Sequence, residues 1–479
     1  KIIQLFDAIA ALPEYDDRLL LKKLSSIEKP QLANLKTHLY KQLLASLRLL
    51  KSNDSVDLQL HEQLDYARIL YSKGLYYQSL KILDKAKILA QQYHQDSFLI
   101  QIISLEKKIE TLHITRSMTD RAGQLTQQAN QVNDKRKVIT QLSNLALQLY
   151  SWFVQNGHAR NEADEIGIKT FFKEALPANA AQLTGFYERL YLYQSYCWYA
   201  FIRQDFIMYY KYAQRWFDLF ESNKEMIEIE TGHYIKSMHI LLNAHFDLRN
   251  FKKFDIILAH FEKFASSELP NKHDIFRVNS FVYINSAKLN NHLMQGTFKE
   301  GLQHVPALTK QLKALEMYLD QHRILVFNYK IATLYFGAGD YATSIDYLRR
   351  IINDHIDLRS DLQCYARLLH MMAHYELGNI ELIESSLIKS VYRFMAKMEN
   401  LTVIEEEMFA FLRGSFKDPS RKVTQALQEF LAKVKKYEKS RFETRAFAYL
   451  DVISWLESKV EHKTMSEIIY AKYLKSPHR

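Results

Sequence analysis

Glycine and proline are scarce in this chain, which has 12 glycines and 7 prolines among 479 residues. No stretch has the proline-, glycine- and serine-rich composition of a linker between domains. The length suits either two or three ordinary domains or one extended solenoid. Because so few residues break regular structure, the sequence favours one continuous body. Bounded β-branched runs with period two are also missing, which predicts an all-α class.

Cysteine is nearly absent, with only Cys197 and Cys364. Two cysteines so far apart exclude a disulfide framework and a thiolate metal site, so we expect a reducing compartment and a cytoplasmic location. No run of about 18 apolar residues is present, which argues against a membrane span. The first residue is Lys rather than Met, which leaves a preceding segment or leader open.

The motifs that commonly carry enzyme chemistry are missing. The sequence has no GxxxxGK[ST] or GxSxG motif, and the GxG fragment at Gly337 lies between two helical patterns, where it predicts a turn. His370 and His374 have the i, i+4 spacing of metal ligands, but the Glu of HExxH is absent, so we interpret them as packing residues. The run Glu405 to Glu407 is interpreted as a solvated helix face. We therefore predict no metal, no cofactor and no enzymatic activity.

Charge of one sign does not dominate, since the net charge of +10 is spread over 64 basic and 54 acidic residues. The clearest local excess of positive charge runs from Lys417 to Arg445. A nucleic acid or an acidic partner is one interpretation of that segment, and a solvated helix surface is the other. The basic residues of the segment are Arg421, Lys422, Lys433, Lys435, Lys436, Lys439 and Arg441.

What recurs is a short turn that ends one apolar helix and opens another. The residues before its aromatic or apolar position are Gly74, Gln204, Arg249, Gly296, Gly339 and Gly378. Further breaks are predicted at Ser117 to Asp120, at Asn156-Gly157 and at Gly414 to Asp418, where Pro419 opens the next helix. About ten helical hairpins, or roughly twenty helices, then fit the chain. We expect residues 1–55 to form an N-terminal helical cap, 56–400 a repeat solenoid and 401–479 C-terminal hairpins or a cap.

Small residues flank the best turns at fixed spacing. Ala332 lies seven before Gly339, and Ser344 lies three after the turn aromatic Tyr341; Ala67 and Ser79 take the same places around Gly74. Small side chains there let two antiparallel helices approach closely. Cys197 takes the small position before Gln204, so we predict a structural role for it.

This pattern resembles the tetratricopeptide repeat family, whose hairpins carry a glycine and aromatic turn with small residues at these spacings. The later steps between turns are 39 to 47 residues, longer than the family's repeat of about 34. The resemblance implies an α-solenoid of antiparallel hairpins in which the first helix of each hairpin lines a concave groove. It also implies a set of groove-facing candidates: Tyr191, Gln194, Trp198, Phe201, Lys236, His239, Asn243, Phe246, Asn290, Tyr329, Thr333 and Phe336.

Aromatic residues are concentrated between Phe186 and Phe220, where 15 of 35 residues are aromatic. An excess beyond the needs of a core is typical of protein interfaces, although these rings could also simply thicken the core. Asn243 and Asn290 can pair with both the N–H and the C=O groups of an extended peptide. We therefore expect a non-enzymatic scaffold that binds a peptide or protein in the groove. The alternative is a regulatory or nucleic-acid-associated module that uses the basic C-terminal helices.

Overall fold

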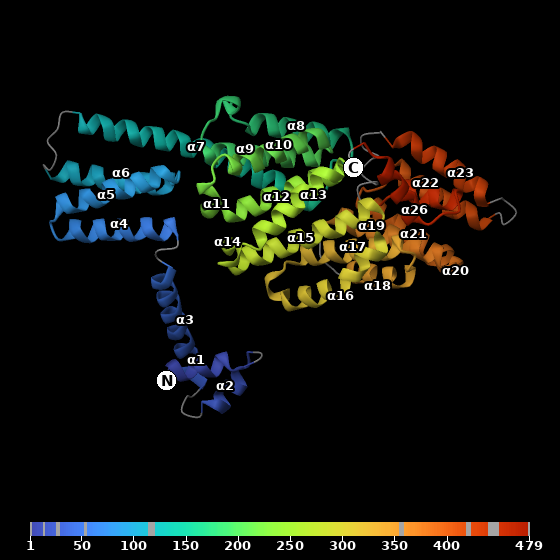
Figure 1. Cartoon of the computed structure of the whole chain (residues 1–479), viewed down its shortest axis with the longest axis horizontal. Helices are drawn as coiled ribbons and strands as arrows, with labels where there is room; N and C mark the ends of the chain where they lie inside the picture. The colour runs from blue at the N-terminus through green and yellow to red at the C-terminus, as the bar shows by residue number, and fades with distance from the viewer. Residues whose placement is uncertain are drawn as a thin grey trace. The chain divides into compact units, whose positions relative to one another are not determined.

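The computed structural model describes residues 2–12, 15–24, 29–51, 55–113, 120–353, 359–417, 423–438 and 450–477. Within these ranges the regular structure is helical throughout and contains no β-strand (Figure 1). The predicted all-α class is therefore confirmed. None of the helices in this part of the chain combines the length and the apolar character that crossing a membrane requires.

Contacts between residues divide the chain into two compact units, the N-terminal unit Lys1–Arg136 and the C-terminal unit Lys137–Arg479. The division falls inside the stretch 56–400 that the sequence predicts as one array, and within a single long helix, α7. The predicted boundaries after residues 55 and 400 stay predictions.

The N-terminal unit holds three apolar clusters among its described residues. Leu5, Leu32 and Leu39 form the first, between α1 and α3, and Leu64 and Leu80 belong to the second, where α4, α5 and α6 pack together. The third consists of Ile103, Leu125 and Ala129, between α6 and α7. Its helices are α1 (Ile2–Ala10), α2 (Asp17–Lys23), α3 (Lys29–Lys51), α4 (Val56–Ser72), α5 (Tyr76–Gln92), α6 (Asp96–Leu112) and the start of α7 (Arg121–Asn156).

A buried carboxylate ties three of these helices together. Glu106 on α6 is fully buried and accepts hydrogen bonds from Arg121 on α7, at 2.9 Å, and from Lys87 on α5. Removing Glu106 would leave the two largely buried cations without this carboxylate, so the pairing makes the position of α7 against α5 and α6 specific.

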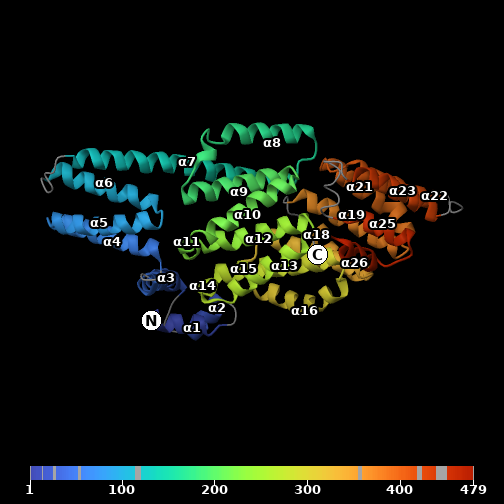
Figure 2. The ribbon, with the colours of Figure 1, turned by 45° about the horizontal axis from the view of Figure 1, so that its top comes forward.

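The C-terminal unit is a succession of helices that pack on their sequence neighbours and on the helix two places along. The contacts α12 with α15, α15 with α17 and α17 with α19 place these helices side by side (Figure 1, Figure 2). The bounds are α8 (Glu162–Ala175), η1 (Ala180–Gln182), α9 (Phe186–Ile202), α10 (Phe206–Glu221), α11 (Glu225–Ile229), α12 (Thr231–Asp247), α13 (Phe251–Ala265), α14 (Glu268–Asn271), α15 (Asp274–Gln295), α16 (Phe298–Ala314), η2 (Glu316–Tyr318), α17 (Gln321–Gly337), α18 (Tyr341–Ile352), α19 (Ser360–Glu376), α20 (Ile380–Leu382), η3 (Ile383–Leu387), α21 (Ile388–Lys397), α22 (Val403–Lys417), α23 (Val423–Tyr437), α25 (Val452–Val460) and α26 (Met465–Lys475).

The recurring turns are confirmed at all six predicted positions. Each turn residue has a positive φ, including the non-glycine residues Gln204 (55°) and Arg249 (51°). In each turn the following residue donates its backbone N–H to the carbonyl five residues earlier, at 2.9–3.1 Å. This is the closing bond of a Schellman motif, which satisfies a carbonyl at the helix end and reverses the chain. Gly157 also has a positive φ where α7 ends, as predicted.

Three further turns of this kind escape the sequence pattern because their left-handed residue is not glycine and no aromatic residue follows two positions later, as Phe206 and Phe251 do after Gln204 and Arg249. His94, Glu399 and His462 have φ values of 53–55° and are followed by the same closing bond, at 2.7–3.0 Å. A bulky residue in this conformation costs free energy, and the sequence carries no sign that the surrounding packing enforces it.

The small residues have the predicted structural role. Ser344 is fully buried and donates its hydroxyl to the carbonyl of Ala332 at 2.8 Å, and Ser79 does the same to Ala67 at 2.7 Å. A side-chain bond to the backbone of the partner helix requires the two helices to be close, which a larger residue would prevent. Cys197 is buried in the core, and burial raises the pKa of its thiol, so its structural interpretation is confirmed.

Three expectations are wrong. α7 is a single helix of 36 residues, where the turn spacing predicts two helices. Gly414 lies inside α22 rather than in a turn, and Asp418 and Pro419 fall outside the described residues, as do Ser117 to Thr119. Glu405 is fully buried rather than solvated, because its carboxylate accepts from the Tyr365 hydroxyl at 2.9 Å and from the backbone N–H of Thr402 at 2.9 Å.

Gly337 at the end of α17 offers a direct test of this packing. An added Cβ would lie 2.5 Å from the ring of Phe298, which is buried against it. We expect Gly337→Ala to lower the free energy of unfolding by about 1–3 kcal/mol, the usual cost of overpacking. Gly167→Ala in α8 is the control, because its Cβ meets no atom within 4 Å and alanine favours a helix. Urea unfolding measures both, and equal stability of the two variants would contradict the contact.

Candidate functional site

The C-terminal unit encloses a hollow with two adjoining compartments. The polar compartment has a volume of about 240 Å³ and the basic compartment about 290 Å³. Both share the residues Phe201, Asn243, Asp247, Val326, Lys330 and Arg359. The polar compartment continues along Phe246, Arg249, Asn290, Leu293, Phe298, Tyr329, Thr333, Phe336, Leu362, Leu450, Asp451, Met465 and Ile469. The basic compartment continues along Tyr150, Phe153, Val154, His158, Trp198, Phe206, Tyr209, Lys236, His239, Ile240, Val282, Tyr283, Ser286, Asp320, His322, Arg323 and Phe327.

Ten of the twelve predicted groove residues line this hollow. They come from α9, α12, α15 and α17, on positions three, four or seven apart that share one helix face. Trp198, Lys236 and His239 line the basic compartment; Phe246, Asn290, Tyr329, Thr333 and Phe336 line the polar one; and Phe201 and Asn243 line both. The fold thus brings into one hollow residues that are up to 138 positions apart in the sequence, from Trp198 to Phe336.

The other two predicted residues, Tyr191 and Gln194, line neither compartment. Gln194 is buried and its Nε2 lies 3.0 Å from Nδ1 of His233 on α12, while the ring of Tyr191 meets the edge of the same imidazole. Their contacts are those of packing between α9 and α12.

Tyr283 on α15 organises one wall of the basic compartment. The imidazole of His239 stacks on its ring with the centroids 4.0 Å apart. Lys236 Nζ lies 5.1 Å from the centre of the same ring, and the Arg323 guanidinium lies 5.7 Å from it. Two cations therefore approach one aromatic face, an arrangement that is stronger where water is excluded.

Arg359 and Lys330 bring two further cations to the hollow. Arg359 has a φ of 55°, holds both oxygens of Asp361 at 2.8 and 3.0 Å, and lies 5.1 Å from the ring centre of Phe153. Its Nη1 also lies 2.9 Å from Nε2 of His322. Lys330 donates to the Ser286 hydroxyl at 2.5 Å. These bonds hold the two cations in place on the wall that both compartments share.

Aromatic side chains form a further wall of the basic compartment. Trp198 on α9 lies 4.9 Å from Tyr150 and 5.5 Å from Phe153, both of which come from the last turns of α7. Phe201 continues the wall at 5.1 Å from Phe153. The basic compartment is therefore lined by aromatic rings as well as by charged groups, and Arg359 and Phe153 bring the two into contact.

The imidazoles of His239 and His322 are uncharged near neutral pH. Burial lowers the pKa of His239 far below its usual value, and the cations Lys236, Lys330 and Arg323 lower it further. Burial, together with the charge of Arg359, also lowers the pKa of His322 to about 4. Burial alone would raise the pKa of Tyr283, but Lys236 and Arg323 outweigh this and lower it. Burial is the main cause for the two imidazoles and nearby cations add to it, whereas the cations alone account for the lowered pKa of Tyr283.

Lys330 and Asp247 titrate near neutral pH. Burial lowers the pKa of Lys330 to about 7 and raises the pKa of Asp247 to about 7, and in each case the charge of the other residue works against the shift. The Oδ2 atom of Asp247 is buried and has no hydrogen-bond partner among the described residues. The shared wall therefore carries a charge that depends on pH in the physiological range.

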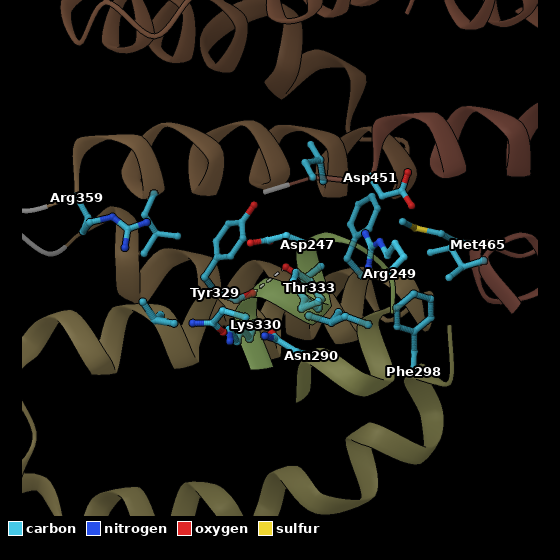
Figure 3. A pocket seen from close by; sticks show the side chains of 18 of the residues that line it. Asp247, Arg249, Asn290, Phe298, Tyr329, Lys330, Thr333, Arg359, Asp451 and Met465 are labelled. Atoms are coloured by element: carbon cyan, nitrogen blue, oxygen red, sulfur yellow. Dashed lines mark hydrogen bonds between the residues drawn. The ribbon is translucent and has the colours of Figure 1, made fainter. Parts of the chain in front are cut away.

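The polar compartment runs between Arg359 at one end and Asp451 and Met465 at the other (Figure 3). Thr333 donates its hydroxyl to the Tyr329 carbonyl at 2.9 Å, and Asn243 Nδ2 lies 3.2 Å from Nε2 of His239. Asn290 is buried beside them, with 5% of its surface exposed. Donors and acceptors are thus interleaved with the rings of Phe246, Tyr329 and Phe336.

Two residues that line the hollow were not predicted, although their helical spacing from a predicted residue indicates the same face. Tyr283 and Ser286 precede Asn290 by seven and four positions, so they share its helix face. No comparable signal marks Arg359, Tyr150 or Leu450, because they reach the hollow through the tertiary arrangement alone.

The pair of histidines that has the spacing of metal ligands lies outside the hollow. His370 and His374 are buried on α19, where burial lowers the pKa of both, with the rings 4.6 Å apart. No cluster of three or more metal-ligating side chains occurs in the described ranges.

In the basic C-terminal segment, Lys433 pairs with Glu407 and Lys435 with Glu457, each at 2.7 Å, and Lys436 is exposed. Arg421, Lys422, Lys439 and Arg441 lie outside the described residues.

Comparison with known proteins gives no relative: no family model matches the chain, and no curated protein or solved structure shows a significant similarity to it.

The buried amine of Lys330 predicts a pH dependence of stability. Its folded pKa of about 7 lies below the ordinary value of 10.5, so between these values the unfolded chain binds more protons and stability rises with pH. Lys330→Met removes this titration. We therefore expect the stability of the wild type relative to Lys330→Met to increase from pH 7 to pH 10, by at most about 1.4 kcal/mol per pH unit.

Urea unfolding at several pH values measures this difference, with Lys310→Met, an exposed lysine on α16, as the control. Lys330→Met also removes a charge that lowers the pKa of Asp247, which is about 7 in the wild type, so this carboxyl titrates at a higher pH in that variant. Measuring the same difference in an Asp247→Asn background removes the contribution of the carboxyl. A stability difference that is constant between pH 7 and pH 10 would show that Lys330 stays charged in the folded protein.

Proposed function

We propose that this chain is a non-enzymatic interaction scaffold, an α-solenoid similar to the tetratricopeptide repeat proteins, which binds a peptide or protein segment in its hollow. The repeated Schellman turns and the side-by-side order of α12, α15, α17 and α19 support the solenoid. Such an array presents a preorganised surface, so little ordering entropy is lost when a partner binds.

The observation that carries the proposal is the polar compartment itself. Asn243 and Asn290 each bear a donor and an acceptor, the pair that an extended backbone requires, and the apolar surface of Phe246 and Phe336 lies beside them. Recognition would then combine aromatic burial, which supplies affinity, with amide hydrogen bonds, which set the register of the bound segment.

The alternative is a nucleic-acid-associated module at the basic C-terminal helices. The pairing of Lys433 and Lys435 with carboxylates reduces the charge that α23 offers to phosphate. The salt dependence of binding separates the two functions, because neutralising phosphates makes affinity fall steeply with salt, whereas an aromatic and amide compartment gives a shallow slope.

Asn290→Leu tests the proposed function. The change keeps the size of the side chain and removes its hydrogen bonds, so we expect affinity for a partner captured from the native source to fall by about tenfold or more. Asn291→Leu is the matched control, because Asn291 lies on the same helix but bonds to Asp255 at 3.1 Å and does not line the hollow. Isothermal titration with the captured partner measures both. Equal losses in the two variants, or no loss in either, would remove the polar compartment as the binding site.

A further inference from the structure

We propose that the basic compartment is a binding site for a small organic anion, a carboxylate or phosphate carried on an aromatic or apolar body. The charged group would lie against Lys236, Arg323 and Lys330, and the body against the rings of Trp198, Tyr150 and Phe153. This goes beyond the proposed function, because a peptide segment in the polar compartment does not require it.

The first argument is the balance of charge. Four basic side chains line the compartment, namely Lys236, Arg323, Lys330 and Arg359, against the two carboxylates Asp247 and Asp320. The pKa values of about 7 leave Lys330 and Asp247 each partly charged at neutral pH. Arg359 is paired with Asp361, which lies behind the wall, and Arg323 is paired with Asp320 at 3.2 Å. No described carboxylate lies within 4 Å of the ammonium of Lys236 or Lys330. The compartment therefore has a net positive charge that its own residues do not neutralise.

The second argument is that this charge converges on one place. The cations Lys236, Lys330 and Arg323 all act on the imidazole of His239, which stacks on Tyr283. They come from two helices, α12 and α17, whose packing fixes their spacing. Cations held together in a partly dry hollow repel one another and lose hydration, and an anion placed among them offsets both costs.

The third argument concerns the body of the ligand. A bare inorganic anion would leave the wall of Trp198, Tyr150 and Phe153 exposed to water inside the hollow. An aromatic or apolar group packs against these rings and gains free energy from burial. The volume of about 290 Å³ is at the low end for pockets that hold small molecules. The ligand is therefore small, with a single charged group.

Four probes on the full chain test the proposal: benzoate, its uncharged isostere benzamide, phenyl phosphate and inorganic phosphate. Isothermal titration measures binding, and intrinsic fluorescence reports whether Trp198 senses it, with Trp198→Phe as the reference. We expect saturable binding of benzoate and phenyl phosphate, with benzamide and inorganic phosphate each weaker by about tenfold or more. Benzamide binding as well as benzoate, inorganic phosphate binding as well as phenyl phosphate, or no saturable binding of any anion would overturn the proposal.

Two variants connect the binding to this compartment. Lys236→Met and Arg323→Gln each remove one cation, and we expect each to weaken benzoate binding about tenfold, while Lys310→Met leaves it unchanged. Circular dichroism and melting temperature identify a variant that does not fold, in which case the other variant and the comparison of benzoate with benzamide decide. Unchanged benzoate binding in a folded Lys236→Met or Arg323→Gln protein would contradict the site.

A further binding experiment distinguishes a free small molecule from the C-terminus of a protein chain. The tetrapeptide Ala-Ala-Ala-Phe presents a terminal carboxylate next to an aromatic ring. Binding of this peptide no tighter than that of benzoate supports a free small molecule. Binding that is tenfold tighter would assign the compartment to a chain terminus and overturn the small-molecule class.

Discussion

The hydrogen bond that closes each left-handed turn is the interaction on which the rest of the structure depends. It satisfies a carbonyl at the end of one helix and sends the chain back as the next helix. Buried serines such as Ser344, which donate to the backbone of the facing helix, then fix how close the two helices come. Because the same closure is repeated through the C-terminal unit, α12, α15, α17 and α19 lie side by side.

This order has a chemical consequence. One face of each of these helices turns toward the same hollow, so residues that are distant in sequence act on the same space. Lys236 on α12 and Arg323 on α17 share the ring of Tyr283, which belongs to α15 between them. Burying cations, imidazoles and an amide-rich wall costs free energy that an entirely apolar core would avoid. The free-energy cost of holding these groups supports our proposal that the hollow is a recognition site rather than a packing defect.

Many of the turns and many of the residues that line the hollow could be predicted from the sequence, whereas features that depend on tertiary packing could not. Glycine turns are visible because glycine alone adopts a left-handed conformation without cost, so Gly339 and Gly378 mark their helix ends, whereas His94 and Glu399 adopt the same conformation unseen. The resemblance to the tetratricopeptide repeat family implied Asn243 and Thr333 as groove residues, and both line the polar compartment. It could not place Arg359 or Tyr150, which arrive through tertiary packing, nor show that Glu405 is buried by its bond to Tyr365.

Hydrogen exchange on the full chain, with and without a partner captured from the native source, tests the central claim that the hollow is the binding surface. The account predicts that binding slows exchange in α9, α12, α15 and α17 and leaves α23 unchanged, because most of the lining residues come from those four helices and none comes from α23. Protection confined to α23, with none in the four helices around the hollow, would contradict the account and assign binding to the basic C-terminal segment.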